Sequence, residues 1–257
     1  MKAFEARHYL LKAQLLAERI PDHKVYPFSL PVLRDFAEIT FHPKVTFLVG
    51  ENGSGKSTLI EALAVAWGFN AEGGSKNFNF ATVKAHSDLH KALRLVKGVK
   101  RARDGFFLRA ESYFNVASNI DALDREPGFS PPVISSYGGV SLHEQSHGES
   151  FMALLENRLR GNGLYILDEP EAALSPMRQL AMLVRMKELA DDNSQFIIAT
   201  HSPILMAYPD ACIYQISENG IQQVSFDETE HVQITRTFLE RPQAMLRRLL
   251  GDDKAET

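Results

Sequence analysis

The fold of this chain follows from one stretch, Val45-Thr46-Phe47-Leu48-Val49-Gly50-Glu51-Asn52-Gly53-Ser54-Gly55-Lys56-Ser57-Thr58. Its first five residues are apolar or β-branched and predict a buried strand, and the glycines that follow match the phosphate-binding pattern G-x-x-x-x-G-K-[ST]. Glycine lets successive backbone N–H groups turn towards phosphate oxygens without a Cβ clash. The next segment predicts a helix whose N-terminus faces the same anion. The stretch therefore predicts a phosphate-binding loop.

This loop is expected to bind a nucleotide. Lys56 would reach the β- and γ-phosphates, and the Ser57 hydroxyl would hold Mg²⁺. The alternative is a chance glycine turn before an ordinary helix, which the preceding strand and the following helix disfavour. The expected nucleotide-binding residues are Gly50, Glu51, Asn52, Gly53, Ser54, Gly55, Lys56, Ser57 and Thr58.

Composition sets broad limits. The 257 residues suffice for one large domain or two small ones, and a net charge of −4 gives no global attraction to nucleic acid, although a local basic face is compatible with it. The single cysteine, Cys212, excludes an internal disulfide and agrees with a reducing cytoplasm. Neither an 18-residue apolar run nor a signal-peptide pattern is present, so a cytoplasmic location without a membrane span is expected.

Two further apolar runs are followed by polar side chains. Asp168 and Glu169 follow the run 164–167, which predicts a buried parallel strand with carboxylates at the edge where such sheets bind ligands. Asp168 is expected to act on Mg²⁺ through a water, and Glu169 to activate the attacking water. His201 follows the run 195–199; a lone histidine is usually structural, but at this edge we expect a γ-phosphate contact.

A capping box begins another predicted helix. Ser146 and Glu149 have the S-x-x-E spacing ahead of an apolar run, so a helix N-terminus with Ser146 and Gly148 is suited to an anion. Capping boxes are common, so this pattern alone is weak.

Together these motifs resemble the ATP-binding cassette (ABC) ATPases over about residues 25–225. Residues 50–57 match Walker A, 164–169 match Walker B, and His201 matches the switch histidine. Residues 171–175 look like the D-loop, and 146–150 stand where the family has its signature motif.

The resemblance implies a single α/β P-loop domain over 1–257. Its mostly parallel sheet would carry an antiparallel β subdomain, a helical signature subdomain near 115–160 and a helical tail near 229–250. It also implies ATP and Mg²⁺ as cofactors and a head-to-tail dimer, in which Ser146 and Gly148 complete the partner's ATP site. The implied catalytic residues are Glu169, His201 and Lys56, and the implied metal ligands are Ser57 and Asp168.

Two departures from the family pattern bear on function. No glutamine lies between the phosphate-binding loop and Gln145, so the Q-loop residue is missing, and Glu111 is a candidate replacement. This puts transport in doubt. The signature SHGES and the step Ala-Thr-His-Ser-Pro look more like soluble ABC ATPases of the SMC, RecF and OLD-nuclease type, the prokaryotic "AAA family ATPase" group. The 90 positions from Lys56 to Ser146 leave no room for a coiled-coil arm.

Three roles follow as alternatives. The first is an ATP-driven clamp or sensor acting with DNA or a protein effector, in repair or phage defence. The second is the nucleotide-binding subunit of a transporter, and the third a nucleotide-dependent regulatory dimer. Residues 84–103 predict a partly amphipathic helix whose cations would contact nucleic acid or simply face solvent. These cations are Lys84, Lys91, Arg94, Lys97, Lys100, Arg101 and Arg103.

Three local expectations complete the prediction. Residues 25–41 predict a hairpin leading into the strand at 45–49. Residues 176–190 predict a helix with Leu180, Leu183, Val184 and Met186 facing inward. Three aromatic residues are candidates to stack on the base or to lie in the core: Tyr26, Phe28 and Phe36.

Overall fold

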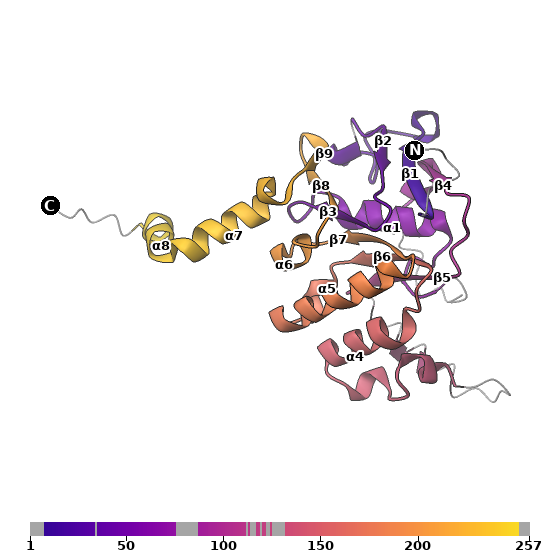
Figure 1. Cartoon of the computed structure of the whole chain (residues 1–257). Coiled ribbons are helices and arrows are strands. Elements are labelled where there is room, and N and C mark those ends of the chain that lie inside the picture. Colours follow the sequence, from indigo (N-terminus) through magenta and orange to yellow (C-terminus); the bar gives the residue numbers. More distant parts are fainter. Residues whose placement is uncertain are drawn as a thin grey trace.

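The computed structural model describes residues 8–33, 35–75, 87–111, 113, 117–118, 120–121, 124 and 132–251. Its centre is a six-stranded sheet in the order β5-β6-β7-β3-β8-β9 (Figure 1). The first five of these strands run parallel, and β9 is antiparallel to β8. The strands are β3 (Val45–Val49), β5 (Asp104–Arg109), β6 (Gly163–Asp168), β7 (Gln195–Ala199), β8 (Cys212–Ser217) and β9 (Gly220–Val224).

A second, three-stranded sheet is antiparallel, in the order β2-β1-β4. It consists of β1 (Leu10–Leu15), β2 (Glu38–Thr40) and β4 (Leu93–Lys97). Helix α1 (Lys56–Trp67) lies between the two sheets, and its apolar residues share one core with both of them (Figure 1). The predicted fold class, a mostly parallel α/β sheet with an antiparallel portion, is confirmed.

Helices cover the other face of the large sheet, where they form a second core. These helices are α4 (His147–Ala153), which continues as a π-helical turn over Leu154–Arg158, α5 (Pro176–Asp191) and α6 (Pro203–Met206). A short helix, α2 (Leu89–Ala92), precedes β4. Single 3₁₀ turns lie at Ala17–Arg19, Pro31–Leu33, Val133–Tyr137, Leu142–Glu144, Pro170–Ala173 and Phe226–Glu228.

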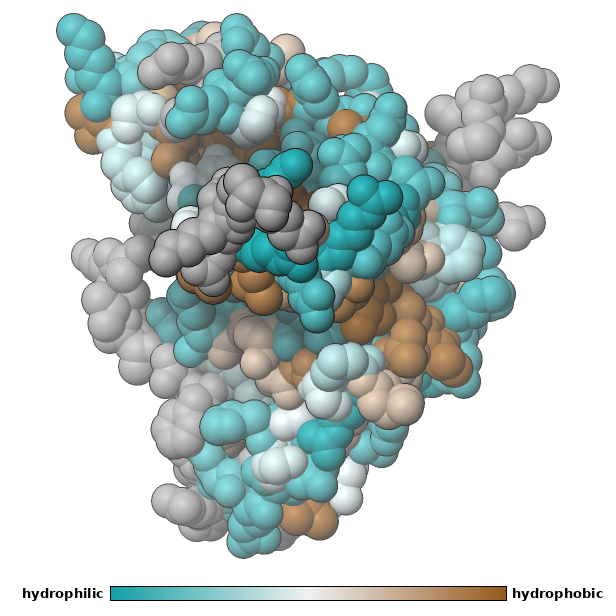
Figure 2. Space-filling view, turned by 90° about the vertical axis from the view of Figure 1, so that its left-hand side faces the viewer, coloured by the Kyte–Doolittle hydropathy of each residue, from teal (hydrophilic) through white to brown (hydrophobic). Residues whose placement is uncertain are grey.

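Two helices, α7 (Glu230–Glu240) and α8 (Pro242–Leu250), project from the body (Figure 1). Figure 2 views the side towards which they project, and apolar surface gathers across the middle of that face. Large exposed apolar side chains of these helices are Ile234, Phe238, Leu239, Leu246, Leu249 and Leu250. Within the described part of the chain, no helix combines the length and apolarity needed to cross a membrane.

The predicted basic helix over 84–103 is wrong. After α2, residues 93–97 form β4, which pairs antiparallel with β1 (Leu93 opposite Leu15). The sheet edge offered by β1 supplies backbone partners, and this tertiary pairing overrides a helical spacing that extends over only a few residues. Lys84 lies outside the described residues.

Two further expectations are corrected. Residues 25–30 form turns, not a strand of a hairpin, and β2 pairs with β1 instead. Pro27 and Pro31 have no backbone N–H to donate to a ladder. Helix α5 buries Met186 and packs Leu183 against the core as predicted, but Leu180 and Val184 are 48% and 62% exposed. The buried stripe contains Gln179, Met182, Met186, Leu189 and Ala190.

Candidate functional site

The loop between β3 and α1 owes its shape to three glycines. Gly50, Gly53 and Gly55 have φ values of +156°, +80° and +98°, which side-chain-bearing residues rarely adopt. A Cβ on Gly50 would also lie 2.2 Å from the backbone oxygen of Ile216. The glycine pattern is therefore a backbone requirement of this loop.

A pocket of about 220 Å³ opens beside the loop. Its lining residues are Tyr26, Leu30, Asn52, Gly53, Gly55, Lys56, Ser57, Thr58 and Glu169. The Lys56 ammonium donates a hydrogen bond to the backbone oxygen of Glu51 (3.0 Å). Burial lowers the pKa of Lys56, and the nearby carboxylates of Glu169 and Asp168 act against that shift. The lysine therefore lies in a pocket whose acidic residues favour its charged form.

The three aromatic residues considered for stacking on the base lie in different environments. Phe28 and Phe36 are buried in the core shared by the two sheets. Tyr26 lines the pocket, and its hydroxyl lies 3.1 Å from the hydroxyl of Thr58. Of the three predicted candidates, Tyr26 alone is available to contact a bound nucleotide.

The predicted metal ligands come together across the sheet edge. The Ser57 hydroxyl donates to the Asp168 carboxylate at 3.2 Å. Burial raises the pKa of Asp168 to about 7, against the opposing effect of Arg109. A hydroxyl and a buried carboxylate are hard oxygen ligands, and Mg²⁺ typically takes few protein ligands and completes its shell with phosphate and water. The residues present thus fit Mg²⁺, and the raised pKa reflects a carboxylate that a cation would stabilise in its charged form.

Glu169 and His201 lie at the same edge. The His201 ring Nε2 lies 3.3 Å from a Glu169 carboxylate oxygen. Glu169 has a left-handed backbone (φ +51°), which is uncommon for a residue with a side chain and clusters at functional sites. Burial and the neighbouring Lys56 lower the pKa of His201. A neutral imidazole therefore lies beside the carboxylate.

His201 is held by two residues that the sequence interpretation did not single out. Its backbone N–H donates to the Glu171 carboxylate, at 2.5 Å. Its Nδ1 lies 3.0 Å from Nε2 of His231, which is on α7. The histidine pair joins the projecting helix to the candidate site.

Arg109 is a site residue that the sequence reasoning missed. It ends β5 opposite Asp168 in the register of β5 and β6. Its guanidinium lies 2.7 Å from the buried Glu61 carboxylate and 3.8 Å from that of Asp168. Glu111, the candidate replacement for the Q-loop glutamine, is much more exposed than Arg109. Its side chain is 86% exposed, and its carboxylate lies 3.4 Å from the Arg109 guanidinium. Its position beside Asp168 follows only from the pairing of β5 with β6, so no local sequence signal marked it.

We expect Arg109→Leu to lower the free energy of unfolding by about 2–3 kcal/mol, because it leaves Glu61 buried without its cation. Urea unfolding monitored by circular dichroism measures this. Lys12→Ala is the matched control, since it breaks an exposed, solvent-screened pair with Glu38 (2.6 Å) and should leave the stability nearly unchanged. Equal losses in the two variants would contradict a structural role for the Arg109 pair.

Ser146 and Gly148 do not line the pocket beside the phosphate-binding loop. Ser146 is exposed and caps α4 through the predicted box with Glu149. Gly148 is buried, and a Cβ there would lie 2.0 Å from the Arg178 guanidinium and 3.0 Å from the backbone oxygen of Ala173. Helix α4 lies beyond α5 from α1 (Figure 1). Within one chain, these two residues are therefore apart from the other candidate residues.

Two solved structures that share this fold come from ABC transporters. The structure of a metal-chelate-type ABC transporter superimposes with a TM-score of 0.53 and 15% identity, over 88% of each chain. The cassette MJ1267 superimposes with a TM-score of 0.52 and 16% identity, over 90% of this chain and 98% of the cassette. At such identities these likenesses concern the fold.

Two protein-family models match the chain. One, described as an AAA domain, matches residues 28–113. The other, described as an AAA domain of the AbiEii toxin, Type IV TA system, matches residues 137–207. Together they span the phosphate-binding loop, Asp168, Glu169 and His201.

The chain therefore carries AAA-type P-loop ATPase sequence over residues 28–113 and 137–207, on a fold like that of ABC-type cassettes. The curated relatives of this ATPase domain differ in role. The ribose import ATP-binding protein RbsA of Yersinia pestis is 26% identical over 179 residues, which are 63% of this chain and 34% of RbsA. The domain thus spans about a third of that relative. The hemin import ATP-binding protein HmuV of Idiomarina loihiensis is 26% identical over 71% of this chain and 75% of HmuV. The retron Vc95 ATPase of Vibrio cholerae is 31% identical over 113 residues, 37% of this chain and 22% of that protein.

Proposed function

We propose that this ATPase domain hydrolyses ATP to ADP and phosphate with Mg²⁺. The strongest support is that two pairs of side chains come into contact beside the phosphate-binding loop. Ser57 contacts Asp168, and Glu169 contacts His201. Bound Mg²⁺ would neutralise charge on the β- and γ-phosphates. The loop N–H groups and Lys56 would bind those phosphates and orient them for in-line attack.

Glu169 is the proposed general base. Its carboxylate lines the pocket beside Lys56, where a water attacking the terminal phosphate would lie. His201, held by Glu171 and His231, would orient that carboxylate and contact the γ-phosphate. The proton lost by the water passes to a Glu169 oxygen, and the lowered pKa of His201 keeps the ring neutral and able to share a hydrogen bond there.

We further propose that two copies pair head to tail around ATP. The placement of Ser146 on an exposed helix start, outside the pocket of its own chain, supports this arrangement. In such a dimer the Ser146 hydroxyl and the region of Gly148 would face the partner's γ-phosphate. Gly148 is also required within its own chain, because a side chain there would collide with the Arg178 guanidinium.

For the process that ATP drives, we propose a clamp or sensor role with DNA or a protein effector. The retron relative and the match to the AbiEii-type model support a defence setting. The exposed apolar side chains of α7 and α8 support a protein partner. The second candidate is the ATP-binding subunit of an importer, which the likeness to RbsA and HmuV favours.

The rate of ATP hydrolysis by purified protein tests the proposal. We expect turnover that requires Mg²⁺ and increases when double-stranded DNA is added at low salt, with the increase fading as salt rises. A rate that is indifferent to DNA, together with co-purification of a membrane protein, would favour the importer. Absence of Mg²⁺-dependent turnover under every condition would contradict the ATPase assignment for this chain.

A further inference from the structure

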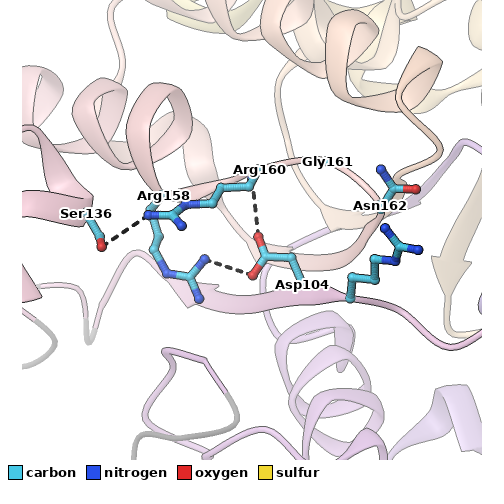
Figure 3. A pocket seen from close by; sticks show the side chains of 7 residues that line it. Asp104, Ser136, Arg158, Arg160, Gly161 and Asn162 are labelled. Carbon is cyan, nitrogen blue, oxygen red and sulfur yellow. Dashed lines mark hydrogen bonds and ion pairs between the residues drawn. The ribbon is translucent and has the colours of Figure 1, made fainter.

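A cavity of about 540 Å³ lies at the edge of the parallel sheet opposite the ATP site (Figure 3). It adjoins Asp104 and Gly163, where β5 and β6 begin, whereas Arg109 and Asp168 end the same strands at the ATP edge. The lining residues are Arg103, Asp104, Ser136, Arg158, Arg160, Gly161 and Asn162. The cavity is therefore separated from the phosphate-binding loop by the length of the sheet.

The one acid that lines this cavity, Asp104, already has hydrogen-bond donors within the protein. The Asp104 carboxylate accepts hydrogen bonds from the Arg158 guanidinium (2.8 Å), the Tyr165 hydroxyl (2.9 Å) and the backbone N–H of Arg160 (3.2 Å). The side chains of Asp104 and Arg158 are only 16% and 15% exposed. Arg158 thus balances Asp104, and the remaining charge of the lining belongs to Arg103 and Arg160.

Arg103 and Arg160 are exposed, and neither enters an ion pair among the residues that the structure describes. The Arg160 guanidinium donates to the Ser136 hydroxyl (3.3 Å), which orients it along the cavity wall (Figure 3). A further acid, Asp192, lies against Gly161 of the cavity wall, and its carboxylate accepts from the Asn162 side chain (3.1 Å). Two guanidinium groups are therefore free to bind an anion.

The wall between these arginines is a tight backbone turn. Gly161 and Asn162 both have left-handed backbones (φ +82° and +50°), and a Cβ on Gly161 would lie 1.8 Å from the Asp192 carboxylate. The backbone N–H of Arg103 donates to the Asn162 oxygen (2.9 Å), which ties the start of β5 to this turn. The turn holds the backbones of Arg103 and Arg160 at a set separation, so that little ordering is needed when they bind one ligand.

A neighbouring cavity of about 240 Å³ extends the cationic surface. It shares Arg103, Asp104 and Arg158 with the first cavity and reaches Trp67. The Lys97 ammonium lies 4.4 Å from the centre of the Trp67 ring. We call the two adjoining cavities the groove; its lining holds three arginines, Arg103, Arg158 and Arg160, and one acid, Asp104.

We propose that this groove binds a phosphate group of a second ligand, separate from ATP in the phosphate-binding loop. Guanidinium groups match phosphate oxygens in pairs, and the Asn162 amide adds a neutral donor. The phosphate belongs either to a nucleic-acid backbone or to a small phosphate compound; both offer the same oxygens. This site does not depend on the ATPase proposal, because none of its residues lines the ATP pocket.

The test uses the full chain saturated with Mg²⁺ and a non-hydrolysable ATP analogue, so that the phosphate-binding loop is filled. One arm measures binding of a fluorescent 20-base-pair DNA duplex by anisotropy over a salt series. The other arm titrates inorganic pyrophosphate by calorimetry. The variant is Arg103→Gln with Arg160→Gln, and the matched control is Arg247→Gln with Arg248→Gln, which removes the same charge from exposed positions of α8.

We expect the groove variant to bind at least one of the probes about tenfold or more weakly, with the control unchanged. For the duplex, the slope of log affinity against log salt should also become shallower by about 2, for two lost phosphate contacts. Loss of duplex binding alone identifies a nucleic-acid backbone, and loss of pyrophosphate binding alone a small phosphate compound. No binding of either probe by the wild type, or equal binding by both variants, would overturn the site and leave the ATPase assignment untouched.

Discussion

Glu169→Gln is expected to slow ATP hydrolysis by about 10²–10⁴-fold, the usual contribution of a general base. The amide keeps the size of the side chain but cannot accept the proton of the attacking water. ATP affinity should stay close to that of the wild type, because the glycine loop, Lys56 and Ser57 are unchanged. Steady-state kcat together with equilibrium binding of a fluorescent ATP analogue measures both quantities.

The same variant should accumulate as an ATP-bound dimer, since hydrolysis would normally release the pair. Light scattering after size exclusion, with and without Mg²⁺–ATP, detects this state. Glu218→Gln is the control, because it removes an equally charged but exposed side chain in the turn after β8. Hydrolysis by Glu169→Gln at the wild-type rate would show that another group is the base. If the variant binds ATP but stays monomeric, the proposed head-to-tail dimer is contradicted.

Lys56→Ala is expected to abolish ATP binding, with affinity falling by at least about 10²-fold. The ammonium would make charge-assisted hydrogen bonds to two phosphates, each contributing about 1.5–3 kcal/mol. Its burial, at 3% exposure, makes these contacts stronger than they would be in water. Calorimetric titration of Mg²⁺–ATP measures the loss.

Two controls separate this effect from misfolding. Lys187→Ala removes an ammonium from an exposed pair with Asp191 on α5 and should leave ATP affinity unchanged. Lys56→Ala itself should keep the wild-type circular-dichroism spectrum, because Lys56 lies in the pocket and belongs to neither hydrophobic core. Micromolar ATP binding by Lys56→Ala would mean that the loop backbone alone holds the phosphates.

Much of the candidate site was predictable because its parts lie at strand ends. The strands 45–49, 163–168 and 195–199 are parallel neighbours, so the residues after them reach one edge wherever the helices pack. That geometry brings Ser57 to Asp168 and Glu169 to His201. Their catalytic roles remain predictions, as does the division of labour between Glu169 and His201.

Other parts depended on contacts between distant segments. Arg109 was not singled out because its partners, Glu61 and Asp168, come from α1 and β6. His231 lies 30 positions after His201 and meets it only because α7 packs against α6. For the same reason Tyr26, one of three equal candidates by sequence, is distinguished by the pocket it lines.

Sequence by itself determined the phosphate-binding loop, the buried strands that lead to it and to Asp168 and His201, and the polar residues at the strand ends. These features are local, because glycine geometry and runs of buried residues act within a few positions of the chain. Only the tertiary structure decided that residues 93–97 form a strand, which face of α5 is buried and that Arg103 and Arg160 line one cavity. The reason is physical: a sheet edge, a core and a charge balance are each completed by segments far apart in the sequence, and no local pattern records the partner.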